Sequence, residues 1–206
     1  MKETDVYTEL ASIRSLMERS SKFISLSGLS GVMAGIYALI GAFFAYQLLY
    51  KDSLEFTVQN FDAFRPQVLP ALLIIAVVVL LLSVITGLFL SAKQAKKEGQ
   101  PFWNPVSKRL FAHMTLPLVT GGIFIIILLT HGNYQLIAPA CLLFYGLALV
   151  AGSHYTFSDV KWLGICEIAL GLLAAAIPGY GLLFWTIGFG ILHILYGSIM
   201  HFKYKQ

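Results

Sequence analysis

The sequence predicts an all-α protein: a polytopic bundle of six transmembrane helices, with both chain ends in the cytoplasm and a short N-terminal amphipathic helix. The first observation behind this fold class is composition, because hydrophobic residues make up 58% of the chain and charged residues only 12%. Water-soluble domains are about twice as rich in charge. The second is that the apolar residues fall in six segments, each within the about 17 to 25 residues, or slightly more, that a tilted membrane helix uses.

The third observation is the placement of the charges. Nine of the ten acidic residues, and essentially all Lys and Arg residues, lie at or beyond the edges of the apolar segments, as burial in hydrocarbon requires. With the N-terminus inside, twelve of the fourteen Lys and Arg residues are cytoplasmic, and only Lys51 and Arg65 lie on the other side. This asymmetry predicts a cytoplasmic N-terminus, and an even number of spans returns the C-terminus to the same side.

The chain is expected to have three parts, which are a cytoplasmic helix (1–22), a six-span domain (23–202) and a cytoplasmic tail (203–206). The predicted spans are 23–50, 66–92, 109–130, 134–153, 161–177 and 181–202. Within 1–22, apolar residues recur at steps of four and three, which predicts an amphipathic helix. This helix either folds against the protein's own inner loops or docks on the membrane surface or a partner.

The first two spans differ in the surface they offer to other helices. The first carries small residues, including Gly31 and Gly35, at steps of three and four. Such a ridge lets a second helix approach closely. The second span is an almost unbroken run of Leu, Ile and Val from Leu69 to Leu82, and we expect much of its surface to face lipid.

The third span contains Pro117, with Thr120 close behind it. A proline inside a helix removes one backbone hydrogen bond, so a kink is expected here. Broken helices of transporters expose backbone groups to a substrate or an ion, whereas in most membrane proteins such a kink only shapes the helix. The fourth span ends in small residues and is expected in the bundle interior.

The last two spans form the most informative region. Glu167, the single acidic residue inside a span, lies 11 residues before Pro178, and His193 lies 12 residues after Gly181. At 1.5 Å per residue both are about 17 Å from the turn, so an antiparallel hairpin places them at the same depth. Each shares a helix face with small residues that favour close packing. These packing positions are Gly164 and Gly171 in the fifth span, and Gly190 and Gly197 in the sixth.

We hypothesise that Glu167 and His193 form a hydrogen-bonded, titratable pair, because an isolated carboxylate is costly in hydrocarbon. Tyr196, His201 and Thr120 could extend this polar patch toward the cytoplasm. The pair would then bind a proton or a ligand. The alternative is structural: the pair only holds a tight hairpin in register.

Other chemistry has little support in the sequence. Short motifs of soluble catalysis are absent, so an enzyme is not expected. No cofactor and no metal site are predicted, although His113 and His201 near the inner surface leave haem or metal binding open as a further alternative. The basic loops are expected to face anionic lipid and not nucleic acid. The predicted partners are therefore the lipid bilayer and either a second copy of the chain or another membrane protein.

The last hairpin, with Gly164, Gly171, Gly188 and Gly197 around Pro178, resembles the hairpin repeat of small HdeD-like, acid-resistance-associated membrane proteins. The stretches PLVTGG, GICEIALGL and GFGILHILYG also resemble a family of uncharacterised bacterial six-span proteins. The resemblance implies a bacterial inner (plasma) membrane location and a helical fold, but no activity. Two functional classes stay open. One is a non-catalytic protein that acts through a partner or self-association, using the ridge of the first span and the N-terminal helix. The other is a small transporter, channel or proton-coupled sensor.

Overall fold

The computed structural model describes residues 27–50 and 66–204, and within these ranges the chain is helical and contains no β-strand. The predicted amphipathic helix at 1–22 lies outside the described residues. The main helices are α2 (Gly28–Tyr50), α3 (Leu69–Lys97), α4 (Pro105–Thr130), α5 (Ile137–Gly152), α6 (Asp159–Ala176), α7 (Gly181–Trp185) and α8 (His193–Lys203). Short 3₁₀ turns, η2 (Pro66–Val68), η3 (Tyr134–Leu136) and η4 (Ser153–Tyr155), adjoin α3 and α5, and the π-helical segment η5 (Thr186–Leu192) joins α7 to α8.

Five helical segments are long and apolar enough to cross a membrane. They are Gly28–Leu49, Leu69–Lys97, Pro105–Thr130, Tyr134–Tyr155 and Gly181–Lys203, and they correspond to five of the six predicted spans. The remaining predicted span, 161–177, is helix α6, which carries three ionisable residues, Asp159, Lys161 and Glu167. Hydropathy therefore identifies these helices well, since long apolar runs satisfy their own backbone hydrogen bonds only as helices when water is absent.

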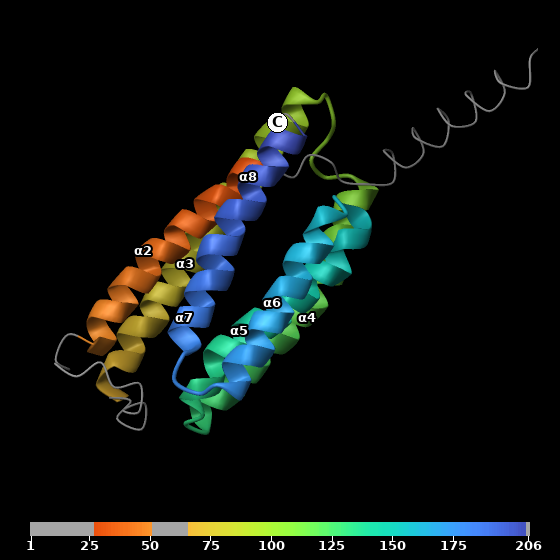
Figure 1. The fold of residues 1–206 in the computed structure, drawn as a ribbon. Helices are drawn as coiled ribbons and strands as arrows, with labels where there is room; N and C mark the ends of the chain where they lie inside the picture. The colour runs from red at the N-terminus through yellow and green to blue at the C-terminus, as the bar shows by residue number, and fades with distance from the viewer. Residues whose placement is uncertain (1–26, 51–65, 205–206) are drawn as a thin grey trace, which may run out of the picture.

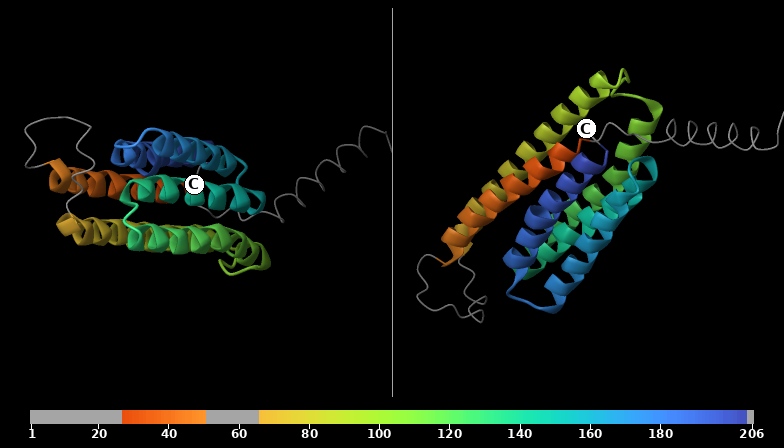
Figure 2. Two further views of the ribbon diagram at one scale, coloured as in Figure 1. Left: turned by 90° about the horizontal axis from the view of Figure 1, so that it is seen from below. Right: turned by 45° about the horizontal axis from the view of Figure 1, so that its top comes forward.

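The helices form two groups, which lie side by side in Figures 1 and 2. In the first group α2 packs between α3 and the final segment η5–α8, and in the second α5 packs between α4 and α6. The groups meet where α5 and α6 contact α7 and η5. The final segment thus leaves α6 at the turn around Pro178 and joins the other group.

Small residues explain this pairing. A Cβ atom at Gly31 would lie 3.2 Å from Cα of Gly197, and one at Gly35 would lie 2.6 Å from the carbonyl oxygen of Gly190. The ridge of α2 therefore packs on the ridge of η5–α8. A Cβ atom at Gly164 would similarly lie 2.8 Å from the carbonyl oxygen of Gly146 in α5. Helices approach this closely only where both surfaces lack side chains.

The prediction that the last two spans pack tightly against each other through their small residues is wrong. The face of α6 with Gly164 and Gly171 packs on α5, and the face with Gly190 and Gly197 packs on α2. The physical reason is that a ridge of small residues fits any matching ridge, and the neighbour in sequence is not the best match here. Helix α6 instead meets the final segment mainly through α7 and η5.

Two further expectations can be compared with the structure. Helix α3 buries only Ser91 and Ala95 and exposes many large apolar side chains, including Ile74, Leu80 and Phe89, in agreement with the lipid-facing surface predicted for the second span. Helix α4, in contrast, continues unbroken through Pro117. The helix is therefore not broken at Pro117, because a single missing N–H group removes only one backbone hydrogen bond, and the kink stays a prediction.

Candidate functional site

Glu167 and His193 come from the two different helix groups and meet where these groups join. Glu167 lies in the middle of α6 and His193 begins α8. Glu167 Oε1 is 3.4 Å from His193 Nδ1, and the two residues are 0% and 6% exposed. Glu167 and His193 therefore lie at the same level of the bundle, as their equal distances from the turn predict. This holds even though α6 and α8 do not pack as the tight hairpin that the prediction assumed.

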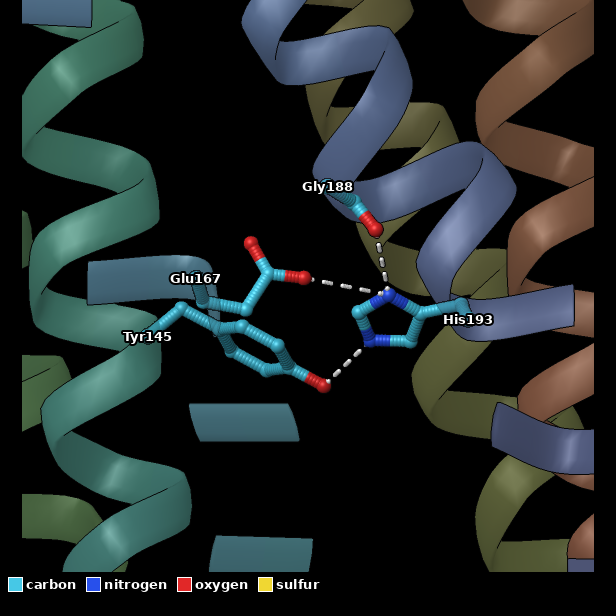
Figure 3. A network of polar contacts seen from close by, with 4 residues as sticks. All are labelled: Tyr145, Glu167, Gly188 and His193. Atoms are coloured by element: carbon cyan, nitrogen blue, oxygen red, sulfur yellow. Dashed lines mark hydrogen bonds and ion pairs between the residues drawn. The ribbon is translucent and has the colours of Figure 1, made fainter. Parts of the chain in front are cut away.

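The hydrogen bonds of His193 determine where its protons lie. The carbonyl oxygen of Gly188 is 2.9 Å from Nδ1, and because a carbonyl can only accept, Nδ1 carries a proton. Tyr145 OH is 2.8 Å from Nε2. In the neutral imidazole the Tyr145 hydroxyl donates to Nε2, and in the imidazolium Nε2 donates to the hydroxyl oxygen. Figure 3 shows these contacts.

The π-helical turn of η5 places Gly188 and His193 for this contact. The two residues are five positions apart, which is the spacing that a π-helix brings into register. Single π-helical turns inside α-helices occur frequently at functional sites. The local backbone therefore positions the imidazole and fixes its tautomer.

The carboxyl group of Glu167 has a different environment. Both of its oxygens are buried, and neither forms a hydrogen bond with the described residues. The proton on Nδ1 is directed to Gly188, so the predicted direct hydrogen bond between Glu167 and His193 is replaced by a 3.4 Å contact. Gly188 also provides space, since a Cβ atom there would lie 2.5 Å from Glu167 Oε2.

Tyr145 is a site residue that the sequence analysis did not identify. It lies on α5, and its ring packs 5.1 Å from Phe189 and 5.4 Å from His193, measured between ring centroids. Tyrosines of membrane proteins favour the two interfaces, where the hydroxyl group is hydrated. A tyrosine near the middle of the predicted span 134–153 was therefore a signal for a buried polar partner.

The other predicted site residues make no hydrogen bond with Glu167 or His193 among the described residues. Tyr196 is partly buried, and its hydroxyl oxygen makes no hydrogen bond with the described residues; the same holds for Nδ1 of His201. Thr120 is exposed on α4, where its hydroxyl donates to the carbonyl oxygen of Leu116 in the same helix. Pro117 also lies on α4. The structure thus does not bring Thr120 and Pro117 into the polar patch around Glu167, because α4 packs on the far side of α5.

The haem or metal alternative relied on His113. Its Nε2 atom is 2.8 Å from Tyr155 OH, and the two rings stack with centroids 4.8 Å apart. Among residues 27–50 and 66–204 no group of three or more His, Cys, Asp or Glu side chains is placed to hold a metal ion. The titratable cluster with the best-defined geometry is therefore Tyr145, Glu167 and His193.

Chemically, this cluster can hold and exchange protons. It contains one carboxyl group, one imidazole and one phenol at a buried junction, and such buried groups change charge only at a large cost unless a partner compensates. Comparison of the chain with protein-family models, with curated proteins and with solved structures finds no match. A function has to be inferred from the geometry of the cluster.

Proposed function

We propose that this chain is an integral membrane protein whose function is coupled to proton binding at Glu167, in the class of small transporters, channels and sensors. One observation carries the proposal: Glu167 is fully buried at the junction of the two helix groups, without a hydrogen-bond donor among the described residues, and 3.4 Å from His193. A carboxyl group serving only to fix the fold is expected to have its oxygens paired.

The proposed placement in the membrane has six spans, with α6 as the fifth and both chain ends in the cytoplasm. The distribution of Lys and Arg supports it. A bacterial inner membrane follows from the resemblance to bacterial six-span proteins and is part of the same proposal. We assign no catalytic role.

Two proton arrangements keep the cluster electrically neutral. In one, Glu167 is a neutral acid and His193 a neutral imidazole that accepts from Tyr145. In the other, the Glu167 proton has moved to Nε2 of His193, which leaves a carboxylate beside an imidazolium, and Tyr145 accepts. Both arrangements hold the same number of protons and are tolerable in a low-dielectric site. When the pH rises and that proton leaves, the Glu167 carboxylate has no compensating charge, which is costly at a buried position. Loss or binding of the proton can therefore alter how the two helix groups meet.

The class that acts through association receives less support. It rests on the ridge of α2 with Gly31 and Gly35 and on the N-terminal helix at 1–22, which lies outside the described residues. The final segment η5–α8 covers the ridge within the same chain. A partner would have to use another surface. The large exposed apolar surfaces of α3 and α4 are what lipid contact alone requires.

The proposal can be tested with the full-length protein in lipid nanodiscs. The infrared C=O stretching band of protonated Glu167, assigned by its loss in Glu167→Gln, is recorded against pH. In parallel, the distance between spin labels at two exposed positions, Ile40 on α2 and Leu172 on α6, is measured. We expect the band to disappear as the pH is raised and the label distance to change with the same midpoint, because the two groups meet at this carboxyl.

Glu167→Gln is the matched control, since it keeps the shape of the side chain and removes its titration. Its label distance should not vary over that pH range. A band that never changes while the protein remains folded, or a titration without any change in distance, contradicts the proposed function.

A further inference from the structure

Three tyrosines connect the buried cluster to one end of the bundle. Tyr145, Tyr196 and Tyr204 come from α5, from α8 and from the residue that follows α8. All three are partly buried and pack against the same apolar cluster, whose members are Leu149, Phe157, Val160, Leu163 and Met200. The three side chains thus pack on one apolar cluster, to which residues of both helix groups contribute.

Tyr196 occupies the middle of this series. It shares a face of α8 with His193, three residues before it, and with Met200, four residues after it. Along α8 it therefore lies between His193, whose Nε2 contacts Tyr145, and Tyr204, whose hydroxyl contacts Asp159. Its hydroxyl oxygen is buried and makes no hydrogen bond with the described residues. A buried phenol normally finds a partner, so this hydroxyl has unused capacity to donate and to accept.

The far end of the series reaches charged residues. Tyr204 OH donates to Asp159 Oδ2 at 2.9 Å, and Lys203 Nζ donates to the same oxygen at 2.7 Å. Asp159 and Lys203 side chains are 25% and 53% exposed, whereas Glu167 is 0% exposed. Proton exchange with water can therefore begin at Asp159 and Tyr204.

Aromatic rings pack beside the cluster toward the turn at Pro178. Phe189 lies 5.8 Å from His193 and 5.2 Å from Trp185, measured between ring centroids. Both residues lie between His193 and this turn in the sequence, in η5 and α7. Neither ring carries a hydroxyl group, so the tyrosine hydroxyl groups on the other side are the better candidates for proton transfer.

We propose that Tyr196 relays protons between the Asp159–Tyr204 end of the bundle and the Glu167–His193 cluster, with water molecules completing the contacts on either side of its hydroxyl. This inference depends on the proposed function. For each proton delivered, Tyr196 accepts one from the side of Tyr204 and releases its own toward Tyr145. Tyr145 then passes its hydroxyl proton to Nε2 of His193 and accepts the proton from Tyr196, so no tyrosine changes its net charge. The resulting imidazolium releases its Nδ1 proton to the Glu167 carboxylate, whose Oε1 lies 3.4 Å away, and returns to the neutral state. The groups facing Glu167 are Tyr145 from α5 and His193 from α8.

The test follows the rate at which Glu167 becomes protonated after a rapid light-induced drop in pH, using the infrared C=O band of the full-length protein in nanodiscs. Tyr196→Phe keeps the ring and removes only the hydroxyl group. We expect protonation to slow by roughly a hundredfold, within the range that positioned proton-transfer groups contribute, with the equilibrium midpoint of the band unchanged. Tyr155→Phe is the matched control, because its hydroxyl contacts His113 outside the route.

The outcomes separate the two proposals. If Tyr196→Phe and Tyr155→Phe both protonate at the wild-type rate, the relay is refuted and the proposed function stands. A midpoint that moves in proportion to the rate shows that Tyr196 acts on the energy of the cluster and not on proton transfer, which also overturns the relay. A wild-type band that does not titrate at all overturns the relay together with the proposed function.

Discussion

Gly188 performs two tasks at the candidate site. Its carbonyl oxygen accepts from His193 Nδ1, and the absence of a side chain leaves room for the Glu167 carboxyl group. A Cβ atom at this position would also lie 2.6 Å from Cδ2 of Leu142. One glycine therefore sets both the imidazole tautomer and the position of the acid.

We expect Gly188→Ala to destabilise the folded protein by about 1 to 3 kcal/mol, because the added methyl group overpacks the space that holds the carboxyl group. Thermal unfolding in detergent measures the effect. Gly122→Ala is the control, since a Cβ atom there would have no neighbour within 4 Å. Equal unfolding temperatures for the two variants would show that the carboxyl group can move away freely.

The sequence predicted that Glu167 and His193 lie close together but not which hydrogen bonds His193 makes. The equal distances of Glu167 and His193 from the turn depend only on helical rise, so they could be counted. The hydrogen bond to Gly188 depends on a π-helical turn, and the bond to Tyr145 depends on a helix far away in the sequence. Neither arrangement follows from local spacing.

Helix pairing is decided by glycines whose missing side chains admit a neighbouring backbone. A Cβ atom at Gly197 would lie 2.5 Å from the backbone nitrogen of Val32 and 2.6 Å from the carbonyl oxygen of Gly28. Backbone atoms of a helix cannot rotate aside as a flexible side chain can. The contact between α2 and α8 is therefore intolerant of any side chain at this position.

Gly197→Ala should separate α2 from α8 and lower the unfolding temperature strongly, because the two backbones must move apart along their length. Gly87→Ala on α3, where a Cβ atom would have no neighbour within 4 Å, should have little effect. Unfolding followed by circular dichroism compares the two. The prediction fails if the Gly197 variant unfolds at the temperature of the Gly87 variant.

The bounds of the helices could be predicted closely, whereas their partners could not. Long apolar runs bounded by charge and by Pro or Gly mark where a membrane helix begins and ends. A ridge of small residues shows that a close contact exists, but several ridges of this chain are alike. Gly146 of α5, for example, packs against Gly164 of α6. The sequence analysis placed the packing surface of this span at its inner end and did not identify Gly146.

Residues 27–50 and 66–204 form two helix groups, and polar side chains join these groups at two levels. One level is the buried cluster around Glu167, and the other is the contact of Asp159 at the start of α6 with Lys203 and Tyr204 at the end of α8. The hydrogen bond from Lys203, aided by that from Tyr204, holds the pKa of Asp159 below its ordinary value, against the opposing effect of burial. The second level is thus strongest when Asp159 is ionised.

The sign of the pH dependence follows from that lowered pKa. The ionised Asp159 stabilises the fold above the pKa of the unfolded chain, and this contribution is lost as the pH falls below about 4, through the lowered folded-state pKa. We expect wild type to unfold at a higher temperature than Asp159→Asn near neutral pH, and the difference to shrink in acid. A difference that is constant with pH would show that the carboxylate charge is not involved. Glu98→Gln, on an exposed carboxyl group beyond the end of α3, controls for general charge effects.

The π-helical turn between α7 and α8 has a consequence for how this chain can vary. His193 reaches the carbonyl oxygen of Gly188 because five residues separate them and the widened turn brings such positions into line. A side chain inside 186–192 can be exchanged without altering this count, whereas adding or removing one residue would rotate the imidazole away from both α5 and α6. We therefore expect related proteins that keep this hydrogen bond to keep the number of residues in this stretch, even where its side chains differ.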